Sequence, residues 1–166
     1  HPERVSRLIV YGGFLRGNET GARTPEEREE AVMLNTTLPL GWNRENPAFR
    51  QFFAIQFLPE GTPEQHEWFS ELARITTTPE VGAAVRTVAG QIDVTDLADR
   101  VRIPTLVLHA TGDAFAPFDQ GREIASRIGG SRFVPLESRN HVLLEEEPAC
   151  TRFLHEVRTF LHEDVA

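Results

Sequence analysis

The chain has 166 residues, 40% of them hydrophobic and 25% charged, which is ordinary for one globular domain with a hydrophobic core. Its net charge of −8 and the lack of a basic cluster argue against nucleic-acid binding through phosphate contacts. No apolar run reaches the ~20 residues that a membrane span needs, and the opening HPERVSR does not resemble a signal peptide. Cys150 is the only cysteine, so we expect no disulfide within the chain and no cysteine-based metal site, and we expect a cytoplasmic protein.

Three short apolar segments predict buried strands. They are RVSRLIVYGG at residues 4–13, IPTLVLHATGD at 103–113 and GGSRFVPLES at 129–138. Their hydrophobic residues run on continuously rather than alternating, which is typical of parallel strands covered on both faces. Ile124 and Ile128 are four residues apart between the second and third strands and predict a crossover helix, and apolar spacing predicts a last helix after Pro148.

The stretch from Phe14 to Arg100 repeats one kind of helix start, a capping residue directly before proline. These starts are Thr24-Pro25, Asn46-Pro47, Thr62-Pro63 and Thr78-Pro79, and Glu27 and Gln65 predict capping boxes at two of them. We therefore expect about four short helices. Apolar spacing agrees for two of them, with one predicted stripe at Trp68, Phe69, Leu72 and Ile75 and another at Val81, Ala84, Val85 and Val88. Aromatic residues there, Trp42, Phe49, Phe52, Phe53, Phe57 and Trp68, are interpreted as core between helices and sheet, or alternatively as the lining of an apolar pocket.

Two polar residues follow predicted strands where ligand sites of open α/β sheets form. Asp113 comes just after the second strand and His141 just after the third. Because adjacent parallel strands end at the same edge, we expect Asp113 and His141 to lie side by side. An aspartate that accepts a hydrogen bond from imidazole fixes the tautomer of a general base, so the two residues are candidates for a catalytic acid and base.

Other candidates have simpler interpretations. Asp119 is the rival acid, although its position favours a role at the start of the crossover helix. His109 ends a strand and is expected to be a packed residue. His155 and His162 are seven apart, which is not the spacing of a metal-binding pair on a helix, and the run from Glu145 to Glu147 is interpreted as a solvated turn.

The chain resembles the C-terminal part of an α/β-hydrolase. HPERVSRLIVYGG is similar to the strand that follows the nucleophile, VRIPTLVLHATGDAFAPFDQGREIA to the acid-bearing strand, loop and helix, and FVPLESRNHVLLEEEP to the histidine loop. The sequence of these segments is most similar to that of bacterial hydrolase domains that are sometimes fused to nucleotide cyclases or winged-helix regulators. The resemblance implies an α/β fold of mainly parallel strands within residues 1–166, with 14–100 as a helical cap insertion. It also implies that Asp113 is the triad acid and His141 the triad base, with no metal or organic cofactor.

The family's Gly-x-Ser-x-Gly nucleophile motif does not occur in these 166 residues, and family order places it before His1. Ser131 follows a glycine pair, but it lies between the expected crossover helix and the third strand and does not match the motif. We therefore expect the C-terminal portion of a serine hydrolase that acts on ester-like acyl bonds and is inactive by itself. The alternative is a sensor or regulatory domain that binds a small molecule without turnover. We expect a homo-oligomer or a complex with the absent N-terminal half, since the first strand would lack its usual neighbour.

Overall fold

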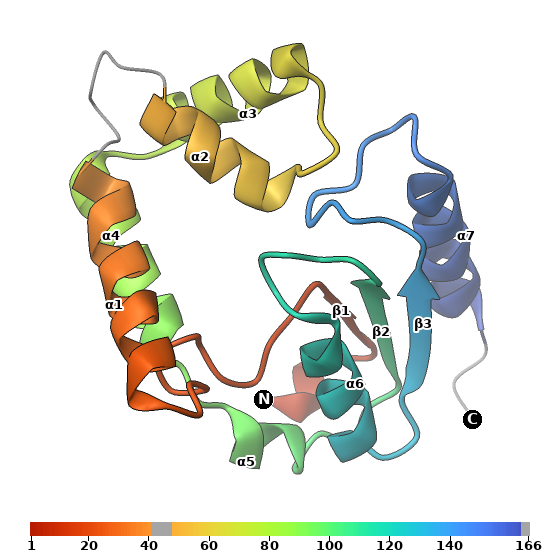
Figure 1. Ribbon diagram of the computed structural model, residues 1–166. Helices are drawn as coiled ribbons and strands as arrows, with labels where there is room; N and C mark the ends of the chain where they lie inside the picture. The colour runs from red at the N-terminus through yellow and green to blue at the C-terminus, as the bar shows by residue number, and fades with distance from the viewer. Residues whose placement is uncertain (41–47, 164–166) are drawn as a thin grey trace. The chain divides into compact units, whose positions relative to one another are not determined.

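The computed structural model describes residues 1–40 and 48–163, and the chain divides into two compact units (Figure 1). One unit combines His1–Leu15 with Thr95–Ala166 and contains the sheet. The other is Arg16–Val94 and is helical, within the range 14–100 that the sequence suggested for an insertion. The role of this second unit as a cap stays a prediction.

The sheet consists of three parallel strands in the order β1, β2, β3, which confirms the predicted strands and their direction. They are β1 (Leu8–Tyr11), β2 (Thr105–Ala110) and β3 (Arg132–Leu136). In the register, Leu8 lies opposite Thr105 and Ala110 opposite Leu136. Since β2 is the central strand, all six of its residues are buried, whereas the four residues of β1 are half-buried.

Helices cover both faces of this sheet. Leu106 and Leu108 of β2 join a core cluster with Ala149 and Phe160 of α7 (Pro148–His162). His109 points to the opposite face, where it packs against α6 (Phe118–Arg127). Side chains alternate between the faces of a strand, so α7 and α6 lie on opposite sides, as Figure 1 shows. The continuous apolar run of β2 therefore reflects burial on both faces.

The helical unit contains α1 (Pro25–Leu40), α2 (Ala48–Phe57), α3 (Pro63–Thr76) and α4 (Pro79–Gln91). Helix α1 packs along α4, and α2 packs along α3. Phe53, Phe57 and Phe69 form an aromatic contact between α2 and α3, with ring centroids of Phe57 and Phe69 5.2 Å apart. Two short helices belong to the other unit, a 3-10 helix η1 (Pro2–Arg4) and α5 (Thr95–Ala98).

The predicted helix starts are confirmed at three prolines, because α1, α3 and α4 begin at Pro25, Pro63 and Pro79. The start predicted at Asn46-Pro47 lies outside the described residues. Thr62 and Gln65 form the predicted capping box. The second predicted box is wrong in one bond. The Glu27 carboxylate accepts from the backbone N–H of Arg23 at 2.7 Å rather than from that of Thr24.

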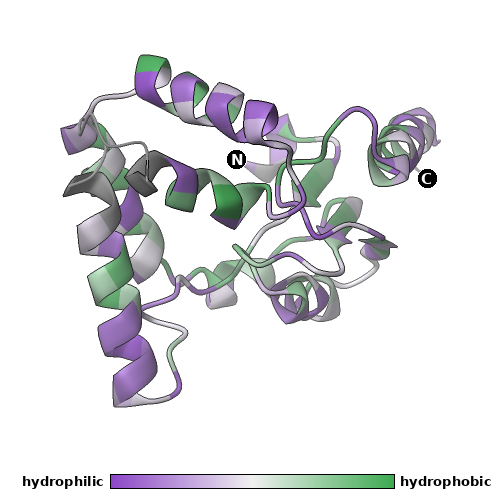
Figure 2. Ribbon diagram, turned by 45° about the horizontal axis from the view of Figure 1, so that its top comes forward, coloured by the Kyte–Doolittle hydropathy of each residue, from purple (hydrophilic) through white to green (hydrophobic). Residues whose placement is uncertain are grey.

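Two predicted core aromatics, Phe52 and Trp68, are exposed in the structure. The predicted stripes on α3 and α4 are also exposed at most positions, namely Leu72, Ile75, Val81, Val85 and Val88. Figure 2 shows hydrophobic and hydrophilic residues alternating along α3 while the strands are hydrophobic. Trp42 and the side chain of Phe49 lie outside the described residues. Over residues 1–40 and 48–163, no helix is both long and apolar enough to span a membrane.

Candidate active site

The loops after β2 and β3 are bound to each other at the carboxyl edge of the sheet. The backbone N–H of Thr111 donates to the carbonyl of Leu136, and that of Gly112 to the carbonyl of Ser138, both at 2.9 Å. These bonds continue the pairing of β2 and β3 beyond the ends of the strands. The loops that carry Asp113 and His141 are therefore held at a fixed separation.

Asp113 and His141 form a direct hydrogen bond across these two loops. Nδ1 of His141 lies 2.7 Å from Oδ2 of Asp113. An ionised carboxylate only accepts hydrogen bonds, so Nδ1 carries the proton and donates it. The Asp113 side chain is fully buried, and 17% of the His141 side chain is exposed. The predicted proximity of the two residues is confirmed, whereas their catalytic role stays a prediction.

The other carboxylate oxygen of Asp113 is bound by its own loop. Oδ1 accepts from the backbone N–H groups of Phe115 and Ala116, each at 2.9 Å. Burying a charge is costly unless hydrogen bonds compensate for the lost water, and these bonds supply that compensation. They also fix the rotamer of Asp113, so that Oδ2 is directed at His141.

His109 is a second histidine beside the same carboxylate. Its side chain is fully buried, as the sequence indicated for a packed residue. Nε2 of His109 lies 2.8 Å from the carbonyl oxygen of Ala116 and 3.6 Å from Oδ2 of Asp113. The short contact to a carbonyl identifies Nε2 as the donor. His109 therefore supports the loop that positions Asp113.

Tyr11 and Gly12, at the end of β1, complete the surroundings of His141. The Tyr11 hydroxyl donates to the carbonyl oxygen of His141 at 2.7 Å. Burial raises the pKa of Tyr11 far above its ordinary value, and the nearby Asp113, Glu147 and Cys150 raise it further. A Cβ on Gly12 would lie 2.7 Å from Cε1 of His141, so the imidazole occupies the space that a side chain would fill.

Sequence reasoning missed Tyr11 and Gly12, although they end the first strand at the same sheet edge as the two candidates. Phe115 was also missed, and its ring centroid lies 4.7 Å from that of His141. The available signal was the position of Tyr11-Gly12 at the end of the first predicted strand, since strand ends at one edge converge on one site.

The rival candidates do not reach this site. The Asp119 side chain is exposed and pairs with Arg122 on α6. Ser131, which follows a glycine pair, donates through Oγ to the carbonyl of Ala125 and precedes β3, at the opposite edge of the sheet. Within the described part of the chain, no group of three or more His, Cys, Asp or Glu side chains is arranged to hold a metal ion.

Comparison with known proteins adds independent information. The family model described as TAP-like protein, an α/β-hydrolase family, matches residues 76–164, which is more than half of the chain. Over 101 residues the chain is 33% identical to the AB hydrolase superfamily protein YisY of Bacillus subtilis. That match covers 59% of this chain and 35% of the relative.

Solved structures agree in fold. A hydrolase from Pseudomonas aeruginosa superposes with a TM-score of 0.73 at 20% identity, covering 98% of this chain and 57% of the other. An esterase from Exiguobacterium antarcticum superposes with a TM-score of 0.74 at 18% identity, and the match covers 96% of this chain and 58% of the esterase. An enol-lactonase from Burkholderia xenovorans superposes with a TM-score of 0.69 at 23% identity, and the match covers 98% of this chain and 58% of the lactonase. The chain thus spans somewhat more than half the length of these similar structures.

Proposed function

Since the chain belongs to the α/β-hydrolase superfamily, we propose that it supplies the acid and the base of a serine hydrolase that cleaves ester-like acyl bonds. The observation that carries this proposal is the 2.7 Å hydrogen bond between His141 and Asp113 at the carboxyl edge of adjacent parallel strands. The substrate class is a small molecule with an acyl group.

In this proposal His141 transfers the protons of both half-reactions. The Nδ1–H bond to Asp113 leaves the lone pair of Nε2 as the base. Nε2 takes the proton of the nucleophilic hydroxyl as its oxygen attacks the acyl carbon, and then gives that proton to the departing alcohol. In the second half-reaction water attacks the acyl-enzyme while Nε2 takes a proton from that water. Nε2 then returns the proton to the oxygen of the nucleophile as the acid product leaves. Asp113 stabilises the imidazolium that forms in each half.

We further propose that the nucleophile and the oxyanion-hole donors come from residues that precede His1 in a longer protein. Two observations support this step. No Gly-x-Ser-x-Gly motif occurs within the 166 residues, and the chain corresponds to 57–58% of the length of the Pseudomonas hydrolase and the Exiguobacterium esterase. In the superfamily order the nucleophile precedes the acid and the histidine.

The test compares the 166-residue chain with its N-terminally extended form on activated esters such as p-nitrophenyl acetate. The chain alone should hydrolyse the ester no faster than its His141→Ala variant, because an acid and base without a nucleophile give weak assistance. The extended protein should turn over the ester, and Asp113→Asn should lower its kcat by roughly 10⁴-fold, as loss of the correct tautomer does in serine proteases.

Two results would contradict the proposal. A His141-dependent burst of acyl-enzyme from the chain alone would mean that the nucleophile lies within these residues. An extended protein that binds acyl compounds but never turns them over would instead favour the ligand-sensing alternative.

A further inference from the structure

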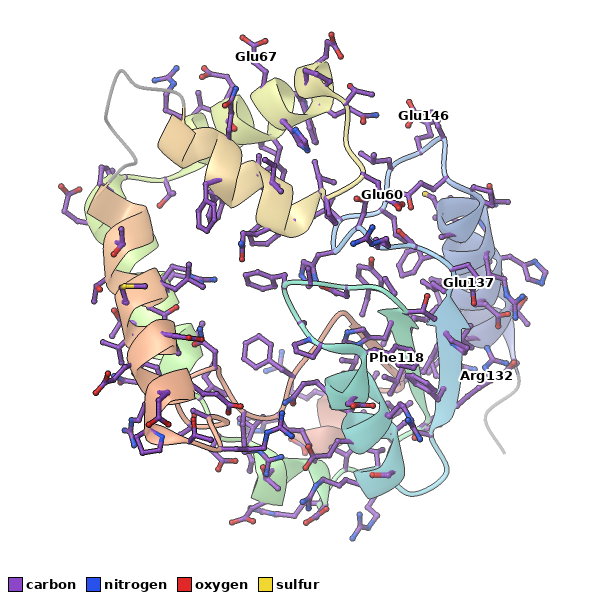
Figure 3. The ribbon with its side chains drawn as sticks, in the orientation of Figure 1. Glu60, Glu67, Phe118, Arg132, Glu137 and Glu146 are labelled. Atoms are coloured by element: carbon purple, nitrogen blue, oxygen red, sulfur yellow. The ribbon has the colours of Figure 1, made fainter. Side chains whose placement is uncertain are left out.

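The three consecutive glutamates before α7 have different environments. Glu145 and Glu146 are exposed, and Figure 3 shows Glu146 at the outer end of the loop that leads into α7. Glu147 is partly buried and its side chain turns back toward the loop that carries His141. The interpretation of this run as a solvated turn is therefore wrong for Glu147.

We propose that Glu147 is a positioning residue that holds the His141 loop against Asp113; its relevance to catalysis rests on the proposed function. The carboxylate of Glu147 binds the loop on both sides of His141. Oε1 accepts from the side-chain amide of Asn140 and from the backbone N–H of Leu144, each at 2.8 Å. Oε2 accepts from the hydroxyl of Ser138.

Two of these partners are buried and Leu144 is partly buried, so their bonds to Glu147 replace water. Asn140 is 1% exposed and Ser138 7%. The Ser138 oxygen in turn accepts from the backbone N–H of Asn140 at 3.0 Å. Loss of the Glu147 carboxylate would leave three donors short of an acceptor, and a buried donor without an acceptor is unfavourable enough to move the loop. His141 lies between the bound residues and would move with them.

A simple helix-capping role does not explain this arrangement. Glu147 is the N-cap residue of α7, yet its side chain makes no hydrogen bond to the first turn of that helix. Only its backbone carbonyl accepts from the helix, from the N–H of Cys150 at 3.0 Å and from that of Thr151 at 3.5 Å. The side chain instead accepts hydrogen bonds from the loop that precedes the helix.

The hydrogen bond from His141 to Asp113 reports directly on this positioning. Functional side chains need placement within about 0.5 Å, and a bond of 2.7 Å tolerates little displacement. We would label the histidines of the 166-residue chain with ¹⁵N and measure two quantities by NMR. These are the tautomer of the His141 ring and the rate at which its Nδ1 proton exchanges with water.

Glu147→Ala should increase the exchange rate of the His141 Nδ1 proton by roughly tenfold or more, and should give a mixture of ring tautomers. Glu147→Gln should largely preserve the wild-type signal. Its carbonyl oxygen can accept from Asn140 and Leu144, and its amide can donate to the Ser138 oxygen. Glu146→Ala is the matched control on an exposed neighbour and should change neither quantity.

Glu147→Asp separates loop positioning from effects on the helix. Aspartate keeps the charge and is a good N-cap, so α7 should form, but it is one methylene too short to reach Asn140 and Ser138 together. It should behave like Glu147→Ala, and it provides the test if the alanine variant does not fold. A wild-type proton signal in a folded Glu147→Ala or Glu147→Asp variant would overturn the proposal.

This experiment is independent of turnover. If the extended protein proved inactive, the ring tautomer would still show whether Glu147 positions His141. Asp113→Asn, which removes the charged acceptor itself, identifies the signal of the pair and should weaken it whatever the role of Glu147.

Discussion

At the scale of single residues, the space for the His141 ring depends on Gly12. Its φ is +57°, in the left-handed region, and an added Cβ would meet His141 at 2.7 Å. Two other glycines separate the effect of the left-handed backbone conformation from that of the steric contact. Gly130 has φ +77° but open space around it, and Gly129 has open space and no positive φ.

We predict a graded loss of stability for alanine at these three positions. Gly129→Ala should change the free energy of unfolding little, and Gly130→Ala should cost about 1–2 kcal/mol for the left-handed conformation. Gly12→Ala should cost a further ~1–3 kcal/mol, because the imidazole or the backbone must move to relieve the contact. Urea denaturation measures all three, and equal losses for Gly12→Ala and Gly130→Ala would contradict the clash with His141.

Tyr11 provides a pH-dependent prediction at the same scale, because it is the only tyrosine in the chain. Burial raises its pKa in the folded state above the ordinary value of about 10. The unfolded chain therefore releases the phenolic proton at lower pH than the folded chain. Folding stability is unaffected below pH ~10 by this group and falls as pH rises above it, since the folded state then binds more protons.

Near-ultraviolet absorbance of tyrosinate measures this directly. In the folded chain the signal should appear only well above pH ~10 or together with loss of helix by circular dichroism. Tyr11→Phe gives the background and should lose the alkaline decline of stability that comes from this group. A reversible titration near pH 10 with the fold intact would show that the hydroxyl is not held by the His141 carbonyl.

How far the sequence predicts the site depends on how each residue acts. Asp113 and His141 could be found because their types suggest chemistry and both follow predicted strands. The strand-end position points to Tyr11 as well, but the contacts of Tyr11 and Glu147 could not be predicted, because they involve a backbone carbonyl, an amide and a hydroxyl whose positions exist only in the folded loop. Nothing in the sequence EEEP distinguishes Glu147 from the adjacent Glu145 and Glu146.

At the scale of elements, local signals succeeded where local chemistry decides the outcome. The Thr-Pro starts of α1, α3 and α4 follow from capping and from the fixed φ of proline, both of which depend on adjacent residues. The three strands followed from continuous apolar runs. Helical spacing also identified α3 and α4, but spacing alone does not say what covers an apolar face. Trp68 and Val85 lie on such faces and are exposed.

At the scale of the whole molecule, β1 is the element whose pairing is incomplete. Among the described residues it pairs only with β2. The backbone N–H groups of Leu8 and Gly12 donate toward the β2 side, to Pro104 and Leu108, so those of Ile9 and Tyr11 point away from it. An open parallel edge of this kind is a template for pairing with another chain. The superfamily places the nucleophile-bearing strand beside it.

We predict that the 166-residue chain self-associates through this edge at micromolar concentration. Val5, just before β1, is 42% exposed, and a lysine there would place a charge at the contact without disturbing the core. Val5→Lys should shift the chain toward monomer in light scattering. Val88→Lys is the matched control, because Val88 is 62% exposed on α4 in the other unit and should leave association unchanged.

Hydrogen exchange identifies the surface involved. Residues 8–11 should be protected at high protein concentration and should lose that protection on dilution, in parallel with the scattering mass. Burial of apolar surface offsets the entropic cost of association only when the area is large, so the four half-buried residues of β1 need their flanking surface as well. A monomer at all concentrations with residues 8–11 protected would contradict the prediction, since the edge would then be covered by the chain itself.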